Sequence, residues 1–261
     1  SDPTLVEFSA PAVVVGDIHG QTVIFENIDK GRKGEMKPGW LTQRYVFLGD
    51  YIDRKQSLEV MTVCFTLKIV FPNFFMLLRG NHETKTINKQ HGFLQELEER
   101  FSKVEQADKL FTEFNEAFTY MPLACILGNS ILMHGGISPK LTSLQDILDI
   151  PKPIVEPNSI ELAGDLLWSD PMIGLKGYKF NTVRGVSVHF GEDVLEDVLV
   201  KLDLRMIVRG HQMMMNGFNF FCSQKLVTVF TAASYYPERA NRGAVLYVSS
   251  DYRVGFKILV P

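Results

Sequence analysis

Aspartate, asparagine and histidine recur where five short apolar runs of the sequence end. The runs are rich in valine, isoleucine, phenylalanine and leucine, a composition typical of buried strands. Each is followed by a turn with glycine: GDIHG at 16–20, GDYIDR at 49–54, RGNHE at 79–83, HGG at 134–136 and RGH at 209–211. Since ligands gather beyond the carboxyl ends of strands in open α/β sheets, we expect these polar side chains to meet in one crevice.

Metal ions explain such a gathering better than packing does. Polar groups without partners are costly to bury, and a bound cation removes that cost. Carboxylates, imidazoles and an amide oxygen suit manganese, iron or zinc. The candidates outnumber the four ligands of one tetrahedral ion, so we expect two divalent metal ions that share a carboxylate. Such a pair, about 3.5–4 Å apart, is suited to in-line displacement at phosphorus. With Arg54 beside it, the pocket would be positive enough to attract a phosphate dianion.

Alternating strand and helix patterns must position these side chains. Apolar residues at helical spacing predict four helices. Their faces are Leu58, Met61, Phe65 and Ile69; Phe93, Leu94, Leu97 and Phe101; Leu110, Phe111, Phe114 and Phe118; and Val194, Leu195, Val198 and Leu202. After residue 217 the pattern predicts only strands, at 218–222, 226–231, 243–249 and 254–260. We assign this α/β chain to one domain, residues 1–261, because site candidates lie on both sides of the proline-rich stretch 150–158.

Composition and charge narrow the possible functions. The chain has 261 residues, of which 46% are hydrophobic, and a net charge of −3, so no overall basic field points to nucleic acid. Its three cysteines lie far apart, which suits a reducing compartment. The most apolar stretch, residues 60–71, contains Lys68 and is too short to cross a bilayer. We expect a cytoplasmic and/or nuclear protein with no nucleic-acid partner and no membrane insertion.

The motifs, taken in order, resemble those of the phosphoprotein phosphatase family, the metal-dependent serine/threonine phosphatases of types 1, 2A and 2B. The first three turns above are joined by HGGISP at 134–139, LLWSDP at 166–171, RGVSVHFG at 184–191 and RGHQ at 209–212. The resemblance implies a type-1/type-2A-like catalytic subunit with a central β-sandwich of mixed sheets flanked by helices, the calcineurin-like metallophosphoesterase fold. It implies hydrolysis of phosphoserine and phosphothreonine in proteins by in-line attack of a metal-bridging hydroxide.

The resemblance also implies a role for each matching residue. One metal ion would be held by Asp17, His19 and Asp50, and the other by Asp50, Asn81, His134 and His211. The general acid would be His82, oriented by Asp53. The phosphoryl group would be bound by Arg54, Asn81, Arg184 and Tyr235. Manganese is the expected metal, with iron or zinc as alternatives, and regulatory or targeting subunits are expected partners beside phosphoprotein substrates.

Several charged residues near the motifs have simpler expected roles. Glu83 is expected to pair with neighbouring groups, as charged residues beside a site often do. Asp170 is expected to fix a loop. The acidic run Glu96, Glu98 and Glu99 is expected to form a solvated helix face.

The loop at 231–237 departs from the family and leaves two alternatives open. Its sequence, TAASYYP, replaces the usual SAPNYC, and Pro237 should change its shape. A catalytically weak pseudophosphatase that acts as a binding module would explain this change, although the intact ligand set argues against it. A dinucleoside polyphosphate hydrolase would share the first three motifs, but the long all-strand C-terminal region argues against that reading.

Overall fold

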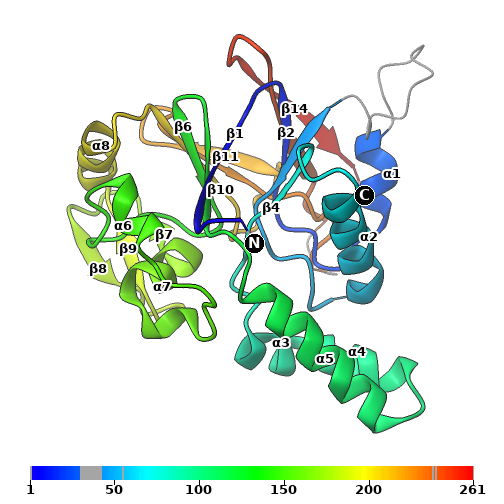
Figure 1. The fold of residues 1–261 in the computed structure, drawn as a ribbon. Helices are drawn as coiled ribbons and strands as arrows, with labels where there is room; N and C mark the ends of the chain where they lie inside the picture. Colours follow the sequence, from blue (N-terminus) through cyan, green and yellow to red (C-terminus); the bar gives the residue numbers. More distant parts are fainter. Residues whose placement is uncertain (1, 30–42, 55, 237, 239, 261) are drawn as a thin grey trace, which may run out of the picture.

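Two β-sheets pack face to face at the centre of the protein (Figure 1). The computed structural model describes residues 2–29, 43–54, 56–236, 238 and 240–260. One sheet has the strand order β1-β5-β6-β10-β12-β11 and the other β14-β13-β2-β3-β4. A small third sheet, β7-β9-β8, lies beside them.

The strands of the first sheet are β1 (Leu5–Phe8), β5 (Ala124–Leu127), β6 (Ser130–Met133), β10 (Met206–Arg209), β11 (Phe218–Phe221) and β12 (Leu226–Val229). Those of the second are β2 (Ala12–Val15), β3 (Arg44–Phe47), β4 (Phe75–Leu77), β13 (Gly243–Val248) and β14 (Val254–Leu259). The third sheet contains β7 (Asp170–Pro171), β8 (Tyr178–Phe180) and β9 (Val188–Phe190).

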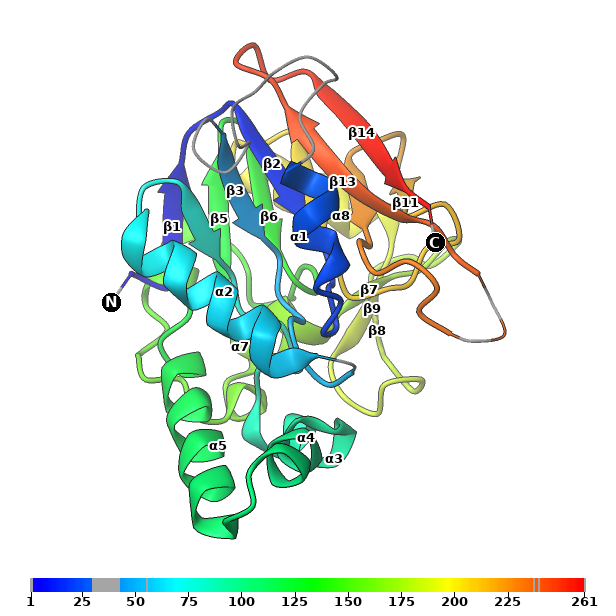
Figure 2. The same cartoon turned by 90° about the vertical axis from the view of Figure 1, so that its right-hand side faces the viewer.

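Helices cover the outer face of each large sheet (Figure 2). They are α1 (Val23–Asp29), α2 (Ser57–Val70), α3 (Lys85–His91), α4 (Phe93–Arg100), α5 (Val104–Phe118), α6 (Leu144–Leu148), α7 (Glu161–Trp168) and α8 (Glu192–Lys201), with a short 3₁₀ turn at Pro157–Ser159. Apolar side chains of α1, α2, α4 and α5 pack on the second sheet, and those of α6, α7 and α8 on the first. The predicted β-sandwich of mixed sheets flanked by helices is therefore confirmed.

Parallel pairing decides where the strand ends meet. β2, β3 and β4 are parallel neighbours in the second sheet, and β6 pairs in parallel with β10 in the first. The valine-rich strands are buried on both faces because the sandwich interface covers one face and helices cover the other. The carboxyl ends therefore meet at one edge of each sheet, and a parallel bridge between Asp17 and Phe230, just beyond β2 and β12, brings the two edges together.

The prediction for α2 was right about the helix and wrong about part of its face. Ile69 is 78% exposed, whereas Val60 and Cys64 are fully buried. The helix begins at Ser57, and the acceptor for its first backbone N–H groups comes from another helix. The Glu96 carboxylate of α4 accepts hydrogen bonds from the backbone N–H groups of Ser57 and Leu58, at 3.0 and 3.2 Å. Glu96 is thus not part of a solvated face, while Glu98 and Glu99 are exposed as expected.

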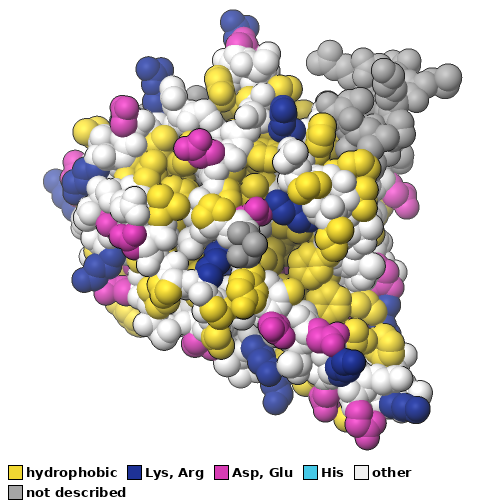
Figure 3. Space-filling model, viewed as in Figure 1, with side chains coloured by type: hydrophobic (Ala, Val, Ile, Leu, Met, Phe, Trp, Pro, Cys, Tyr) yellow, Lys and Arg dark blue, Asp and Glu magenta, His cyan; other side chains and the backbone are white. Residues whose placement is uncertain are grey.

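The surface mixes charges. On the face drawn in Figure 3, Lys and Arg side chains alternate with Asp and Glu among the described residues. No helix among the described residues is long and apolar enough to cross a membrane.

Replacing Glu96 with alanine should lower the free energy of unfolding by about 1–2 kcal/mol, because two N–H groups at the positive end of the α2 dipole lose their acceptor. Urea denaturation followed by circular dichroism measures this change. The matched control is Glu98→Ala on the exposed side of α4, the helix that carries Glu96. This substitution should change the free energy of unfolding by less than about 0.5 kcal/mol. Equal effects of both substitutions would contradict the capping role.

Candidate active site

The turns after the five parallel strands bring the expected residues together. Several of them have left-handed backbone conformations: φ is 46° at His19, 54° at Asp50 and 71° at His211. This region is uncommon for residues with a Cβ atom, and such strain is concentrated at functional sites. Here it turns the chain sharply, so that these side chains lie close together beyond the strand ends.

Two motif glycines are required because backbone and carboxylate approach closely. A Cβ atom on Gly80 would lie 2.3 Å from the Asp50 Oδ1 atom, and one on Gly210 would lie 2.4 Å from the Asp17 Oδ1 atom. Glycine is the residue that permits such contacts.

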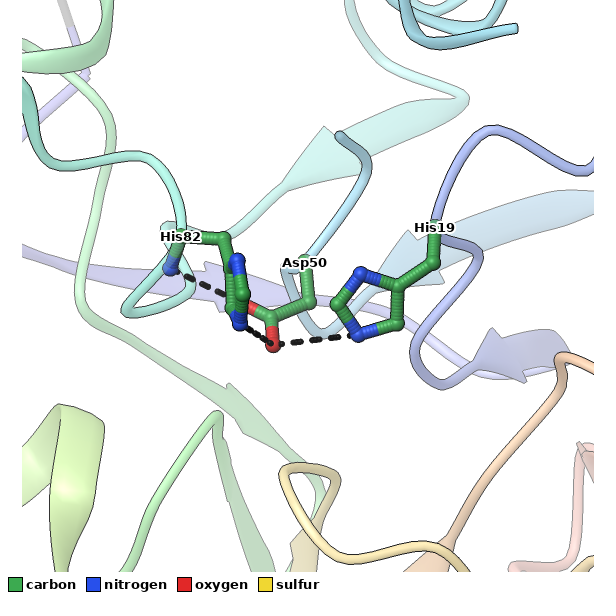
Figure 4. Close-up of side chains that lie close together, drawn as sticks. All are labelled: His19, Asp50 and His82. Carbon is green, nitrogen blue, oxygen red and sulfur yellow. Dashed lines mark hydrogen bonds and ion pairs between the residues drawn. The ribbon is translucent and has the colours of Figure 1, made fainter. Parts of the chain in front are cut away.

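Asp50 lies at the centre of the cluster (Figure 4). Its Oδ2 atom is 3.5 Å from His19 Nε2 and 3.8 Å from His82 Nε2, whereas its Oδ1 atom is 3.3 Å from His134 Nε2. The side chain is almost fully buried. Each of its two oxygens therefore faces a different group of possible metal ligands.

One ligand group consists of Asp50, Asn81, His134 and His211, the set expected for the second ion. His134 Nε2 is 2.8 Å from the Asn81 Oδ1 atom and 3.2 Å from His211 Nδ1. His211 Nδ1 is in turn 2.9 Å from Asn81 Oδ1. All four side chains are buried.

The other ligand group contains Asp17, His19 and Asp50. His19 Nε2 is 3.8 Å from the Asp17 Oδ2 atom and 3.5 Å from the Asp50 Oδ2 atom. The ring of His82 lies against that of His19, with centroids 4.8 Å apart. His82 Nε2 thus shares this side of Asp50, and by distance alone it also satisfies the requirements for a ligand.

Backbone carbonyls orient two of the imidazoles. Nδ1–H of His19 donates to the carbonyl oxygen of Ile52 at 2.8 Å, and Nδ1–H of His134 donates to that of Leu48 at 3.1 Å. A carbonyl only accepts, so Nδ1 of each ring carries a proton and Nε2 is the atom directed at Asp50. Metal-binding histidines are typically fixed in this way.

The electrostatics of the cluster also favour cations. Burial raises the pKa of Asp17 to about 6, with a further contribution from Asp50. Burial lowers the pKa of His19 to about 3 and that of His211 well below its ordinary value. The Nε2 atom of His211 is buried without a hydrogen-bond partner among the described residues. The neutral imidazoles of His19 and His211, beside crowded carboxylates, are donors that fit divalent ions.

His82 and Asp53 form a hydrogen-bonded pair at the entrance of the cluster. His82 Nδ1 is 2.6 Å from the Asp53 Oδ2 atom, and the other oxygen of Asp53 accepts the backbone N–H of Phe93 at 3.1 Å. Burial alone would lower the pKa of His82, but Asp50 and the bond to Asp53 raise it to about 9. The side chain of His82 is 15% exposed, more than the 2% of His19 and the 0% of His134.

The two expected phosphate-binding arginines lie on different sides of the cluster. Arg184 Nε donates to Asp170 at 3.0 Å and its Nη2 donates to the carbonyl of His211 at 3.3 Å. Asp170 also accepts from Arg209 at 2.9 Å. The expectation that Asp170 fixes a loop holds, since its carboxylate ties the Arg184 loop to β10.

Arg54 lies on the other side, against the loop at 231–236. Its guanidinium carbon is 4.0 Å from the ring centroid of Tyr235, and that ring lies 5.0 Å from the ring of His19. The structure therefore brings Tyr235 and Arg54 together beside His19. Pro237, whose effect on the loop was predicted, lies outside the described residues.

The sequence did not reveal how far Glu83 supports the site. It pairs with neighbouring groups as expected, but these are the backbone N–H groups of Asp50, Tyr51 and Gly80, at 2.8, 2.9 and 2.9 Å. Its side chain is fully buried. The feature of the sequence that could have indicated this supporting role is the position of Glu83 beside Asn81 and His82 in the RGNHE motif.

Known proteins resemble this chain along its whole length. Serine/threonine-protein phosphatase C23G10.1 of Caenorhabditis elegans is 41% identical over 260 residues, which are 99% of this chain and 55% of that protein. Serine/threonine-protein phosphatase PP1-delta of the same organism is 38% identical over 265 residues, which are 100% of this chain and 83% of that protein. The chain thus spans about half the length of the first relative.

A solved structure and a family pattern agree with these relatives. The structure is a protein serine/threonine phosphatase from Saccharomyces cerevisiae with similarity to human phosphatase PP5. It superimposes with a TM-score of 0.86 and 31% identity, over 100% of this chain and 84% of that one. Residues 10–215 match the family described as calcineurin-like phosphoesterase. The chain belongs to the calcineurin-like phosphoesterase family.

Proposed function

We propose that the protein hydrolyses phosphoserine and phosphothreonine in protein substrates. The observation that carries this proposal is the buried carboxylate of Asp50, whose two oxygens face two separate ligand groups. The similar proteins named serine/threonine-protein phosphatase cover the same residues and support the substrate class.

The residues present fit two divalent ions. Asp17, His19 and Asp50 would hold one, and Asp50, Asn81, His134 and His211 the other. When bound, such ions activate water and neutralise charge on a phosphoryl group. The mixed nitrogen and oxygen donors favour manganese, with iron or zinc as alternatives.

We assign His82 to proton donation rather than to metal binding. It is the most exposed of the clustered histidines, and Asp53 fixes its ring through Nδ1, which leaves Nε2 directed at the site. A serine or threonine alkoxide is a poor leaving group that needs a proton. The imidazolium form of His82 supplies it from Nε2, and Asp53 holds the ring in place through Nδ1 and stabilises its charge before the transfer.

Arg54, Asn81, Arg184 and Tyr235 would surround the phosphoryl group. Arg184 is already aligned by Asp170 and by the carbonyl of His211, so little reorganisation is needed when phosphate binds. Arginine suits this role because its planar fork can bind two phosphoryl oxygens. Regulatory or targeting subunits and a cytoplasmic or nuclear location remain predictions from the sequence.

The purified chain should release phosphate from a phosphothreonine peptide when manganese is added, and lose this activity with a chelator. A colorimetric phosphate assay measures the rate, and a dinucleoside tetraphosphate serves as the comparison substrate. Preference for the dinucleotide would contradict the proposal. Inactivity on the peptide despite two bound ions per chain would instead support a binding module.

His82→Asn should lower kcat by about 10²–10⁴-fold, the usual contribution of a general acid, with metal content unchanged. Asp53→Asn should also lower kcat, because His82 loses the carboxylate that holds its ring. Steady-state kinetics and elemental analysis of the same samples provide both readouts. If His82→Asn instead loses one ion per chain, then His82 is a ligand and the assignment is wrong.

Glu83→Gln should weaken metal binding by about 10–100-fold, as loss of a partner that orients a ligand typically does. In the parent chain three backbone N–H groups donate to the Glu83 carboxylate. The glutamine amide would place its own N–H donors against some of them. Calorimetric titration of manganese into the metal-free chain measures the affinity, with the exposed Glu98→Gln as control. Unchanged affinity would show that Glu83 does not position Asp50.

A further inference from the structure

The guanidinium of Arg54 lies against two aromatic rings rather than beside a carboxylate. Its central carbon is 4.0 Å from the ring centroid of Tyr235 and 5.5 Å from that of Tyr236. The two tyrosine rings meet edge to face, with centroids 4.8 Å apart. Arg54 is exposed and has no ion pair with a carboxylate among the described residues. Its hydrogen bond to the described part of the chain is a long one, from Nη1 to the backbone carbonyl of Tyr235 at 3.5 Å.

Both tyrosines belong to a loop that is held firmly at its base. The side chain of Asn241 is buried; it accepts the backbone N–H of Tyr235 at 2.8 Å and donates to the carbonyl of Ala232 at 2.9 Å. Thr231 accepts the N–H of Gly16 at 2.8 Å, which ties the loop to the turn that carries Asp17. The loop can therefore fix the position of a side chain that packs on it.

Aromatic rings and phosphate bind different parts of a guanidinium. The face of an aromatic ring attracts the face of the guanidinium cation. The N–H donors of the guanidinium lie in its own plane and point outward, away from the ring. An exposed arginine otherwise samples many rotamers, which it must give up when it binds two phosphoryl oxygens. Aromatic contacts restrict those rotamers beforehand and leave the donors available.

We propose that Tyr236 is a positioning residue that, together with Tyr235, holds the face of Arg54 and presents its N–H edge to the phosphoryl group. This inference rests on the proposed function, because it assigns Arg54 to phosphate. Tyr236 acts through Arg54 and does not take part in bond breaking.

Inorganic phosphate is the probe that tests this role. Calorimetric titration into the manganese-loaded chain should show about three- to ten-fold weaker binding for Tyr236→Ala, the range expected for loss of one cation–π contact. Tyr236→Phe keeps the ring and should stay within about two-fold of the parent chain. With a phosphothreonine peptide, Tyr236→Ala should raise KM and leave kcat nearly unchanged.

A double-mutant cycle shows whether Tyr236 acts through Arg54. In an Arg54→Ala background, Tyr236→Ala should weaken phosphate binding by less than about two-fold. Tyr252→Ala, at a tyrosine that is 54% exposed in the turn between β13 and β14, controls for loss of an exposed ring. The proposal is overturned if Tyr236→Phe is as harmful as Tyr236→Ala, if Tyr236→Ala has no effect, or if its effect persists without Arg54. Because phosphate binding is measured directly, a chain that binds phosphate but cleaves no phosphopeptide would refute the proposed function alone.

Discussion

The rest of the site depends on one buried carboxylate, that of Asp50. Three imidazoles approach its two oxygens from turns that follow three different strands. Burial opposes the charge of Asp50, but His134 and His82 hold its pKa well below the ordinary value. A carboxylate that stays ionised in this position can serve cations on both sides at once, which is what a site for two ions requires.

The fold supplies the conditions for that arrangement. β3 delivers Asp50 between β2 and β4, and the first sheet brings β6 and β10 to the same edge. Left-handed turns aim the side chains inward, and Gly80 lets the neighbouring turn approach the carboxylate. The buried Glu83 carboxylate accepts the backbone N–H groups of Asp50 and Tyr51 and so holds the turn that carries Asp50 in place.

Much of this arrangement could be predicted from the sequence because the metal-binding residue types stand directly after the apolar runs that form strands. An apolar run that stops at glycine and then at Asp or His identifies both a strand and its functional end, so the strands β2, β3, β4, β6 and β10 and the clustered residues could be predicted together. Helices α1, α3, α6 and α7 were missed because they are short or lack a clear apolar stripe. The supporting contacts of Glu83, Asp170 and Tyr236 join loops far apart in the sequence, and residue spacing carries no information about such contacts. Glu96 was misjudged because its partners are backbone groups of another helix.

Counting bound metal ions tests the central claim most directly. Elemental analysis and manganese titration of the intact chain should find two ions, with Asp50→Asn weakening the binding of both. Asp17→Asn should weaken one of them most, since the Asp17 side chain belongs to the ligand group of His19 and meets the other group only through the backbone N–H of His211. If Asp50→Asn keeps either ion at the parental affinity, then Asp50 is not shared and the account is wrong.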